Sequence, residues 1–205
     1  MAKPANLKTA LAAVMALSLG ACTTQRDSQP VRTATEQLEI SAAVDRAVEQ
    51  IDLKIPAGTK IFVDTADFDA IDGKYAIGAI KDRLLKNGAR LMEKRDAAEM
   101  VVEIRSGALS IDQHKFLIGI PSFDLPVPLS TAPLSFPEIA FYKREDNQGV
   151  AKFALTAYDA KDGIWRDSAG PRFGYSHNIN RVVMFLYSWT KDDLIPPADK
   201  DKDKE

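Results

Sequence analysis

The chain has 205 residues, of which 45% are hydrophobic, and its 27 basic and 29 acidic residues give a formal net charge of −2. This length and apolar content suit one folded domain of ordinary size. The mildly acidic balance lacks the basic footprint of a nucleic-acid-binding protein. The single cysteine excludes a disulfide within the chain.

The first residues of the chain are typical of an exported protein. Lys3 and Lys8 precede an apolar run over residues 11–19, and no acidic residue lies before that run. Small residues then lead to Cys22. A basic start, a short apolar run and small residues before a cleavage site form a secretory signal peptide. The run has about half of the roughly 20 residues that a membrane-spanning helix needs. A spanning anchor is therefore not expected.

The position of the cysteine makes this segment resemble a bacterial lipoprotein signal. The resemblance implies that Cys22 receives a diacylglycerol and that cleavage occurs between Ala21 and Cys22. It also implies a place in the outer membrane, facing the periplasm, because Thr23 is not the aspartate that favours inner-membrane retention in enterobacteria. The alternative for a lone cysteine is a small buried side chain. We expect a signal peptide over residues 1–21, then an acylated cysteine and flexible tether over 22–35.

Two helices are predicted in the domain that follows, residues 36–195. Apolar residues at spacings of three and four predict a helix over 36–52, with Thr35 as its N-terminal cap. A second helix is predicted over 73–87, where Asp72 provides the cap and an Asn-Gly pair provides the stop.

Strands are predicted between and after these helices. They are expected at residues 59–64, 89–94, 99–112, 137–145, 149–159 and 163–174. Gly107 marks a bend or bulge, and residues 147–149 and 161–163 are expected to form hairpin turns. Two helices and about six strands predict an α/β (α+β) two-layer sandwich with a mixed sheet. The charged segment 196–205 lacks apolar periodicity and is expected to be a disordered tail.

The order of these elements adds a family resemblance. Together with Gly119-Ile120-Pro121 and the segments 137–143 and 148–152, it resembles an uncharacterised family of proteobacterial lipoproteins, a domain of unknown function. The resemblance covers nearly all of the chain after Cys22 and implies no catalytic residue. The topology is also similar to the periplasmic domain of curli-secretion lipoproteins and to the amino-terminal domain of the Tol propeller protein. Similarity of fold does not transfer function.

An acidic loop over residues 64–73 is the strongest candidate for a metal site. Asp64, Asp67 and Asp69 offer the carboxylate oxygens that calcium prefers. The spacing of an EF-hand is not met, because Ile71 stands where a third ligand should follow. A loop that joins a strand to a helix is the favoured interpretation, and no metal or other cofactor is expected.

The histidines do not indicate an enzyme. His114 and His177 are the only two, they lie far apart in the sequence, and they have no cysteine partner for a zinc site. The chain contains no Gly-x-Ser-x-Gly elbow, Gly-x-Gly-x-x-Gly fingerprint or P-loop. We therefore expect a protein without catalytic residues.

Residues 116–137 form an unusual segment that is apolar and carries five of the 11 prolines. Proline disfavours regular structure, and a long apolar loop is uncommon without a function. One interpretation is a loop that folds back over the sheet and buries its own apolar groups. The other is an extended arm that docks a partner, a like subunit or the bilayer surface. The candidate interaction residues are Phe116, Ile120, Pro121, Phe123, Leu125, Pro126, Val127, Pro128 and Leu129.

The last apolar segment, residues 178–195, contains a run from Val182 to Trp189 that suits either a final buried strand or a helix. Closing the core is the favoured role for it. Tyr187 and Trp189 beside Lys191 also suit a membrane-interface anchor.

These observations lead to one leading hypothesis for function. The chain is expected to be a non-enzymatic accessory or assembly factor of the cell envelope, held at the outer membrane by lipid on Cys22. Its expected partners are that membrane and either an envelope protein or a second copy of the chain, but no nucleic acid. The alternatives are a subunit of a homo-oligomeric envelope or secretion assembly, and a metal-dependent periplasmic enzyme that uses the acidic loop.

Overall fold

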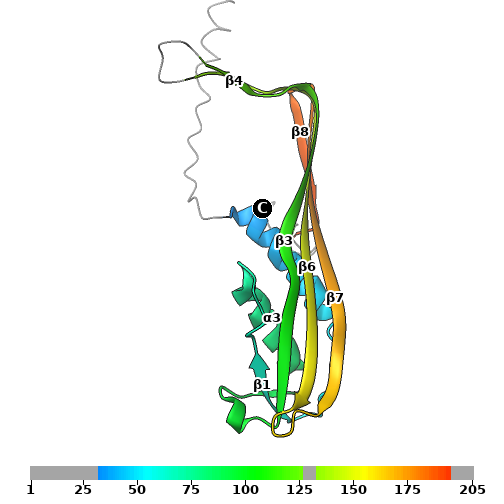
Figure 1. The fold of residues 1–205 in the computed structure, drawn as a ribbon. Coiled ribbons are helices and arrows are strands. Elements are labelled where there is room, and N and C mark those ends of the chain that lie inside the picture. The colour runs from blue at the N-terminus through cyan, green and yellow to red at the C-terminus, as the bar shows by residue number, and fades with distance from the viewer. Residues whose placement is uncertain (1–31, 127–132, 195–205) are drawn as a thin grey trace, which may run out of the picture. The chain divides into compact units, whose positions relative to one another are not determined.

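The computed structural model describes residues 32–126 and 133–194 of the chain (Figure 1). Residues 1–32 and 33–205 form separate units, and the fold below is that of the second unit. The predicted signal peptide, Cys22, most of the predicted tether and the predicted tail lie outside the described residues.

The described residues form two α-helices, a short 3₁₀ helix and eight strands. In chain order they are α2 (Ala34–Glu49), β1 (Lys60–Asp64), α3 (Gly73–Lys86), β2 (Arg90–Leu91), η1 (Arg95–Ala97), β3 (Met100–Ile120), β4 (Phe123–Leu125), β5 (Leu134–Phe136), β6 (Ile139–Asp159), β7 (Trp165–Val183) and β8 (Tyr187–Asp192). The second predicted strand, 89–94, is thus reduced to the two residues of β2.

Six of the strands form one mixed sheet in the order β2-β1-β3-β6-β7-β8, and β4 pairs only with β5. Strand β1 is parallel to β2 and to β3, whereas the other neighbours are antiparallel. Helices α2 and α3 contact each other and lie on the same side of the sheet (Figure 1). The predicted two-layer α+β fold with a mixed sheet and two main helices is confirmed.

Helix α2 begins at a reciprocal capping box. The Glu36 N–H donates to the Thr33 hydroxyl over 3.3 Å, and the Thr33 N–H donates to Glu36 Oε2 over 2.7 Å. These bonds satisfy N–H groups near the helix start that have no intrahelical partner. The prediction of Thr35 as the cap is wrong, because the glutamate that completes the box stands three residues after Thr33.

The core lies between the two helices and the sheet face that they cover. Alternate residues of β6 from Gly149 to Ala157 are buried, as the period of two in a strand requires. Phe153 is fully buried, and its ring lies 5.7 Å from that of Phe68, which comes from the loop before α3. The buried stripe of α2 that packs into this core consists of Ile40, Ala43, Val44, Ala47 and Val48.

Helix α2 lies very close to β6 and β7. A Cβ atom at Gly149 would overlap the backbone carbonyl of Glu39, and one at Gly174 would overlap that of Ala43. The Ser176 hydroxyl also donates to the Glu39 carbonyl over 2.6 Å. Neither glycine has a positive φ. Glycine is therefore required at these positions because there is no room for a side chain, not because of its conformational freedom.

This close approach explains why one predicted hairpin is wrong. Residues 147–149 do not turn; they lie inside β6, which replaces the two predicted strands 137–145 and 149–159 by one strand of 21 residues. Gly149 is needed there for contact with the helix, not for a turn. The other predicted turn, 161–163, is confirmed, with Gly163 at a φ of 71°. The predicted irregularity at Gly107 is also confirmed, because the β3–β6 register shifts between Ser106 and Ala108.

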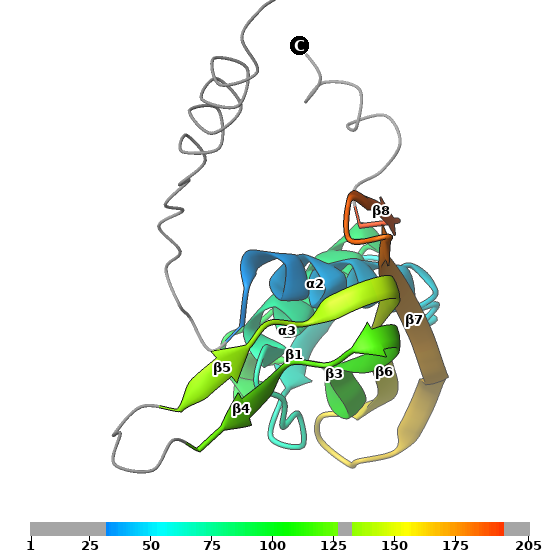
Figure 2. The same ribbon diagram turned by 90° about the horizontal axis from the view of Figure 1, so that it is seen from above.

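Four strands continue past the start of helix α2 and form what we call the arm, residues 112–120, 139–148 and 177–192 (Figure 1). Strand β3 runs to Ile120, well beyond its predicted end at residue 112. It remains paired with β6 to Ile139, although the register shifts once more between Ile118 and Gly119. Strands β7 and β8 complete the arm and are joined by a turn over residues 184–186. The β4–β5 hairpin follows from the end of β3 (Figure 2).

Candidate functional site

The end of the arm, together with the β4–β5 hairpin that follows from it, carries most of the exposed large apolar side chains of the described residues. We call this surface the apolar tip. Its members come from β3, the β4–β5 hairpin, the start of β6, and the β7–β8 turn with β8. They are Phe116, Ile118, Ile120, Phe123, Leu125, Leu134, Phe136, Ile139, Phe141, Met184, Phe185, Leu186, Tyr187 and Trp189.

The β4–β5 hairpin within the tip has one apolar and one polar face. Directly paired residues of antiparallel strands point to the same side. Phe123 pairs with Phe136, and Leu125 pairs with Leu134, whereas Asp124 pairs with Ser135 on the other side. The rings of Phe123 and Phe136 stack with centroids 4.9 Å apart. The hairpin therefore presents four apolar side chains together.

The β7–β8 turn places bulky apolar residues in a conformation that they rarely adopt. Met184 and Phe185 have φ values of 52° and 48°, in the left-handed region where glycine, asparagine and aspartate are favoured. Their side chains are 55% and 61% exposed, and the neighbouring Leu186 is 75% exposed. The Met184 and Phe185 N–H groups donate to the carbonyls of Phe141 and Ala140. The backbone thus holds three apolar side chains outward at a conformational cost.

The described part of the predicted interaction segment lies in this tip. Phe116, Ile120, Pro121, Phe123, Leu125 and Pro126 are all exposed. Val127, Pro128 and Leu129 lie outside the described residues. The interpretation in which the segment folds back and buries its own apolar groups is wrong for the residues described. Strand and hairpin pairing, rather than an irregular loop, organises residues 116–120, 123–125 and 134–136.

The sequence interpretation missed the second half of the tip. The run from Val182 to Trp189 was expected to close the core, but it forms the end of β7, the turn and the start of β8. Tyr187 and Trp189 are 71% and 47% exposed. The expectation of a buried strand is wrong, because residues 184–189 are all exposed and Val182 is only half-buried.

The acidic loop has a structural role. The Asp64 carboxylate accepts a hydrogen bond from the Ala66 N–H over 3.0 Å, and the Asp69 carbonyl accepts one from the Ser106 hydroxyl over 3.1 Å. Between Asp67 and Asp69, Phe68 packs into the core. Over residues 32–126 and 133–194, no three His, Cys, Asp or Glu side chains are grouped so that they could hold a metal ion.

The two histidines lie apart on the arm. His177 Nε2 lies 3.2 Å from the Gln148 side-chain amide, and its Nδ1 lies 3.5 Å from the Asp193 carboxylate. The Asp193 carboxylate also accepts from Arg46 over 3.1 Å and from the His177 backbone N–H over 2.7 Å. These contacts tie the end of β8 to helix α2. His114 lies on β3, opposite Asp146.

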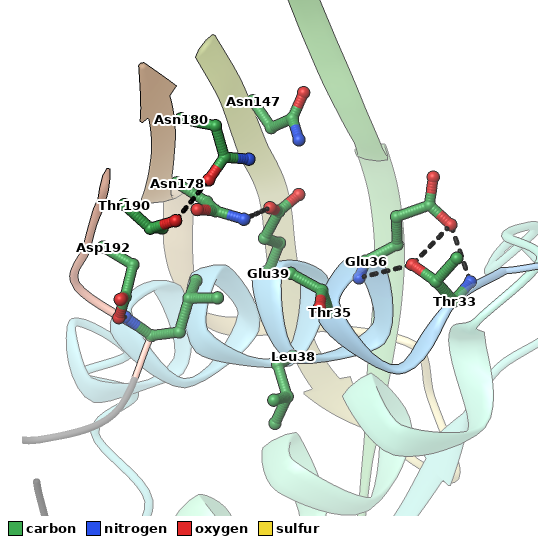
Figure 3. A pocket seen from close by; sticks show the side chains of 11 residues that line it. Thr33, Thr35, Glu36, Leu38, Glu39, Asn147, Asn178, Asn180, Thr190 and Asp192 are labelled. Atoms are coloured by element: carbon green, nitrogen blue, oxygen red, sulfur yellow. Dashed lines mark hydrogen bonds between the residues drawn. The ribbon is translucent and has the colours of Figure 1, made fainter. Parts of the chain in front are cut away.

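A polar pocket of about 450 Å³ lies where helix α2 begins beside the arm (Figure 3). Its lining includes Asn147, Asn178, Asn180 and Thr190, whose hydroxyl donates to Asn180 Oδ1 over 2.6 Å. Among these described lining residues there is no histidine, cysteine or lysine. The pocket therefore brings together hydroxyl, amide and carboxylate groups, and its hydroxyl–carboxylate pair, Thr33 with Glu36 over 3.1 Å, belongs to the capping box of α2.

Glu39 forms the buried floor of this pocket. It is fully buried, and its Oε1 accepts from the Asn178 amide over 2.8 Å (Figure 3). Glu39 Oε2 and Asn178 Oδ1 are buried and have no hydrogen-bond partner among the described residues. Burial raises the pKa of the Glu39 carboxyl above its ordinary value of 4.5, and the nearby side-chain amides of Asn178 and Asn147 offset only part of that rise.

Glu39→Gln is expected to stabilise the fold at neutral and alkaline pH. A raised pKa in the folded state means that the stability linked to the proton on Glu39 is fully present below pH 4.5 and is lost as the pH rises through the folded value. The substitution removes the buried charge and supplies an amide that can donate to Asn178 Oδ1. Thermal unfolding should show a higher Tm for the variant at about pH 8 and a smaller difference at about pH 4. An equal difference at both pH values would contradict this assignment.

No helix of the described residues is long and apolar enough to cross a membrane.

Comparison with known families gives one match. A family model described as a family of unknown function (DUF6655) matches residues 16–171. The matched range includes both helices and β1 to β6, whereas the outer half of β7, the 184–186 turn and β8 lie outside it. No curated protein matches the chain.

Proposed function

Because the chain belongs to this family of unknown function, as its sequence predicts, we propose a function from its own surfaces. The chain is a non-enzymatic accessory or assembly factor of the bacterial cell envelope. Lipid on Cys22 holds it at the outer membrane, facing the periplasm. Its working surface is the apolar tip of the arm, through which it meets another component of the envelope.

The concentration of exposed apolar side chains at the tip carries this proposal. Soluble monomers rarely expose contiguous apolar patches larger than a few hundred Å², and larger patches mark interaction sites. The turn at Met184 and Phe185 adds weight, because strained backbone persists where the surrounding structure and function require it. The polar pocket and the acidic loop offer no comparable feature.

The sequence supplies the anchor. Cys22 follows an apolar run and small residues that resemble a lipoprotein signal. One acyl chain binds a bilayer only marginally, whereas two or more anchor a protein stably. Residues 23–32 then connect the lipidated cysteine to the capping box at Thr33.

Cys22→Ser is expected to abolish lipid attachment and processing, because a hydroxyl cannot replace the thiol that accepts the diacylglycerol. In cells supplied with labelled palmitate, the wild-type chain should carry label and run at its processed size. The variant should remain at precursor size without label, and Thr23→Ser serves as the neighbouring control that keeps both properties. Label on the Cys22→Ser chain would show that the anchor is assigned to the wrong residue.

The free edge of the sheet favours a second candidate, a homo-oligomeric envelope assembly. Strand β8 is the last strand in the sheet order, and nearly all of its side chains are exposed. Edge strands offer unpaired N–H and C=O groups to another chain. A rise in mass with protein concentration, measured by light scattering, would favour this candidate over a single copy.

A further inference from the structure

Apolar side chains near the end of the arm lie on both faces of the sheet, although Leu117 and Val182 on the second face are half-buried. Ile118 pairs with Tyr142, so these two point to one side of the sheet. Leu117 pairs with Lys143 and points to the other side, as does Val182. The 184–186 turn lies at the end of the β7–β8 pair, and its three side chains are exposed. A protein partner that docks on one face would leave much of this surface in water.

The polarity of the arm also changes in steps along its length. Residues paired across the four strands form rows, and successive rows on one face are about 7 Å apart. On the face opposite the helices, the outermost row is apolar or aromatic throughout: Ile118, Tyr142, Val183 and Tyr187. The next row has an aromatic residue at each end and two arginines between them: Phe116, Arg144, Arg181 and Trp189. The third row is mostly charged or polar: His114, Asp146, Ile179 and Lys191.

This order of rows matches the polarity profile of a lipid bilayer surface. Acyl chains accept apolar side chains, while tryptophan, tyrosine and long basic side chains prefer the headgroup level. The amphipathic β4–β5 hairpin fits the same arrangement, with its phenylalanine and leucine face toward the acyl chains and Asp124 toward water. Two further acidic residues, Glu138 and Glu145, are both paired with Lys143, over 2.9 Å and 3.1 Å.

The length of chain before the domain is compatible with this contact. Thr33 and Asn147 line the same pocket, so helix α2 begins beside the base of the arm. From Asn147 to Ile139, β6 covers about 26 Å at about 3.3 Å per residue. The residues from Cys22 to Arg32, fully extended, could span up to about 36 Å. A lipid on Cys22 and the tip can therefore reach the same bilayer.

We propose that the apolar tip inserts into a lipid bilayer to the level of Trp189 and Arg181, giving the chain a second membrane contact besides its lipid. This inference rests on the proposed function, because it assigns a lipid bilayer as the envelope component that the tip meets. The lipid fixes the chain to the membrane, and the tip fixes the orientation of the domain on it.

The two tryptophans of the chain allow a direct test. Trp189 lies on β8 in the tip, whereas Trp165 lies at the opposite end of β7, opposite Tyr158, and is 61% exposed. Trp165→Phe leaves Trp189 as the only reporter, and Trp189→Phe leaves Trp165 as the matched control. Both are made in a chain that begins at Thr23. This chain keeps every core side chain, since the core extends from Ile40 to Ala169, and it lacks Cys22, so the result does not depend on lipidation.

The measurement is tryptophan fluorescence in the presence of vesicles of two types, phosphatidylcholine alone and phosphatidylcholine mixed with phosphatidylglycerol. Each type is also prepared with brominated acyl chains, which quench a tryptophan that enters the bilayer. The proposal predicts a blue shift and quenching of Trp189 on both vesicle types and no change for Trp165. Met184→Asn/Phe185→Gly should weaken the Trp189 response about a hundredfold in lipid concentration, because two apolar side chains leave the bilayer.

Four results would overturn the proposal. No Trp189 response to either vesicle type would exclude insertion. A Trp189 shift that follows protein concentration without lipid would assign the tip to a second copy of the chain. An equal response of both tryptophans would indicate that the chain unfolds on lipid. Binding only to vesicles with phosphatidylglycerol, with no weakening by Met184→Asn/Phe185→Gly, would indicate attraction by surface charge. The lipid labelling of Cys22 is independent of these results. The proposal of a lipid anchor and the proposal of an inserted tip can therefore be rejected separately.

Discussion

Gly174→Ala is expected to destabilise the fold by about 3 kcal/mol or more, the upper range for overpacking a close contact. The added methyl group would overlap the Ala43 carbonyl oxygen and lie 2.6 Å from the Ala47 N–H nitrogen. Both are backbone atoms of helix α2, which cannot yield as a flexible side chain would. To relieve the overlap, the helix must move away from β7, which breaks the Ser176 contact and opens the core. Urea unfolding should show a lower midpoint with an unchanged slope.

Gly170→Ala provides the matched control on the same strand. A Cβ atom at Gly170 meets nothing within 4 Å, and its φ is not positive. Alanine is less costly than glycine in a strand by a fraction of a kcal/mol, so this variant should be as stable as the wild type or slightly more stable. Equal losses in both variants would mean that glycine in β7 is needed for a reason other than the approach of α2.

Met184→Asn/Phe185→Gly is expected to stabilise the fold by about 1 kcal/mol while it removes the outermost apolar side chains. Non-glycine residues in the left-handed region cost roughly 1 kcal/mol or more each, and asparagine and glycine are the residues that such turns favour. Little packing is lost, because both side chains are more than half exposed. Urea unfolding measures the gain.

Alanine at the same two positions separates conformation from side-chain loss. Met184→Ala/Phe185→Ala removes the same apolar groups but keeps residues that disfavour a positive φ. It should therefore give no gain in stability. If the asparagine–glycine variant were also no more stable than the wild type, the turn would not be strained, and the structural support for a selected apolar tip would be lost.

Local patterns in the sequence predicted the helical layer and the first strand. The spacing of Ile40, Val44 and Val48 defines α2, and the Asn-Gly pair that follows Lys86 marks the end of α3, as predicted. These elements are predictable because one face of each is buried, so that burial imposes a period on the sequence. The capping threonine was misplaced by two residues, which is within the ordinary uncertainty of helix ends.

The arm could not be predicted in the same way, because no core imposes a period on it. Its apolar residues near 116–125 and near 184–189 are some 60 positions apart, and only the pairing of β3, β6, β7 and β8 brings them to one end of the sheet. An apolar run such as Val182 to Trp189 suggests a core strand when burial is assumed. Gly149 suggests a turn because the sequence does not show that a helix approaches it. In both cases tertiary contacts decide what the local pattern leaves open.

Co-sedimentation with isolated cell-envelope membranes tests the central claim most directly. The chain that begins at Thr23, without its lipid, is mixed with these membranes and compared with its Met184→Asn/Phe185→Gly variant. If the apolar tip is the working surface, the wild-type chain should pellet with the membranes, and the more stable variant should remain in the supernatant. Equal sedimentation of the two chains, or none of either, would contradict the assignment of function to the tip.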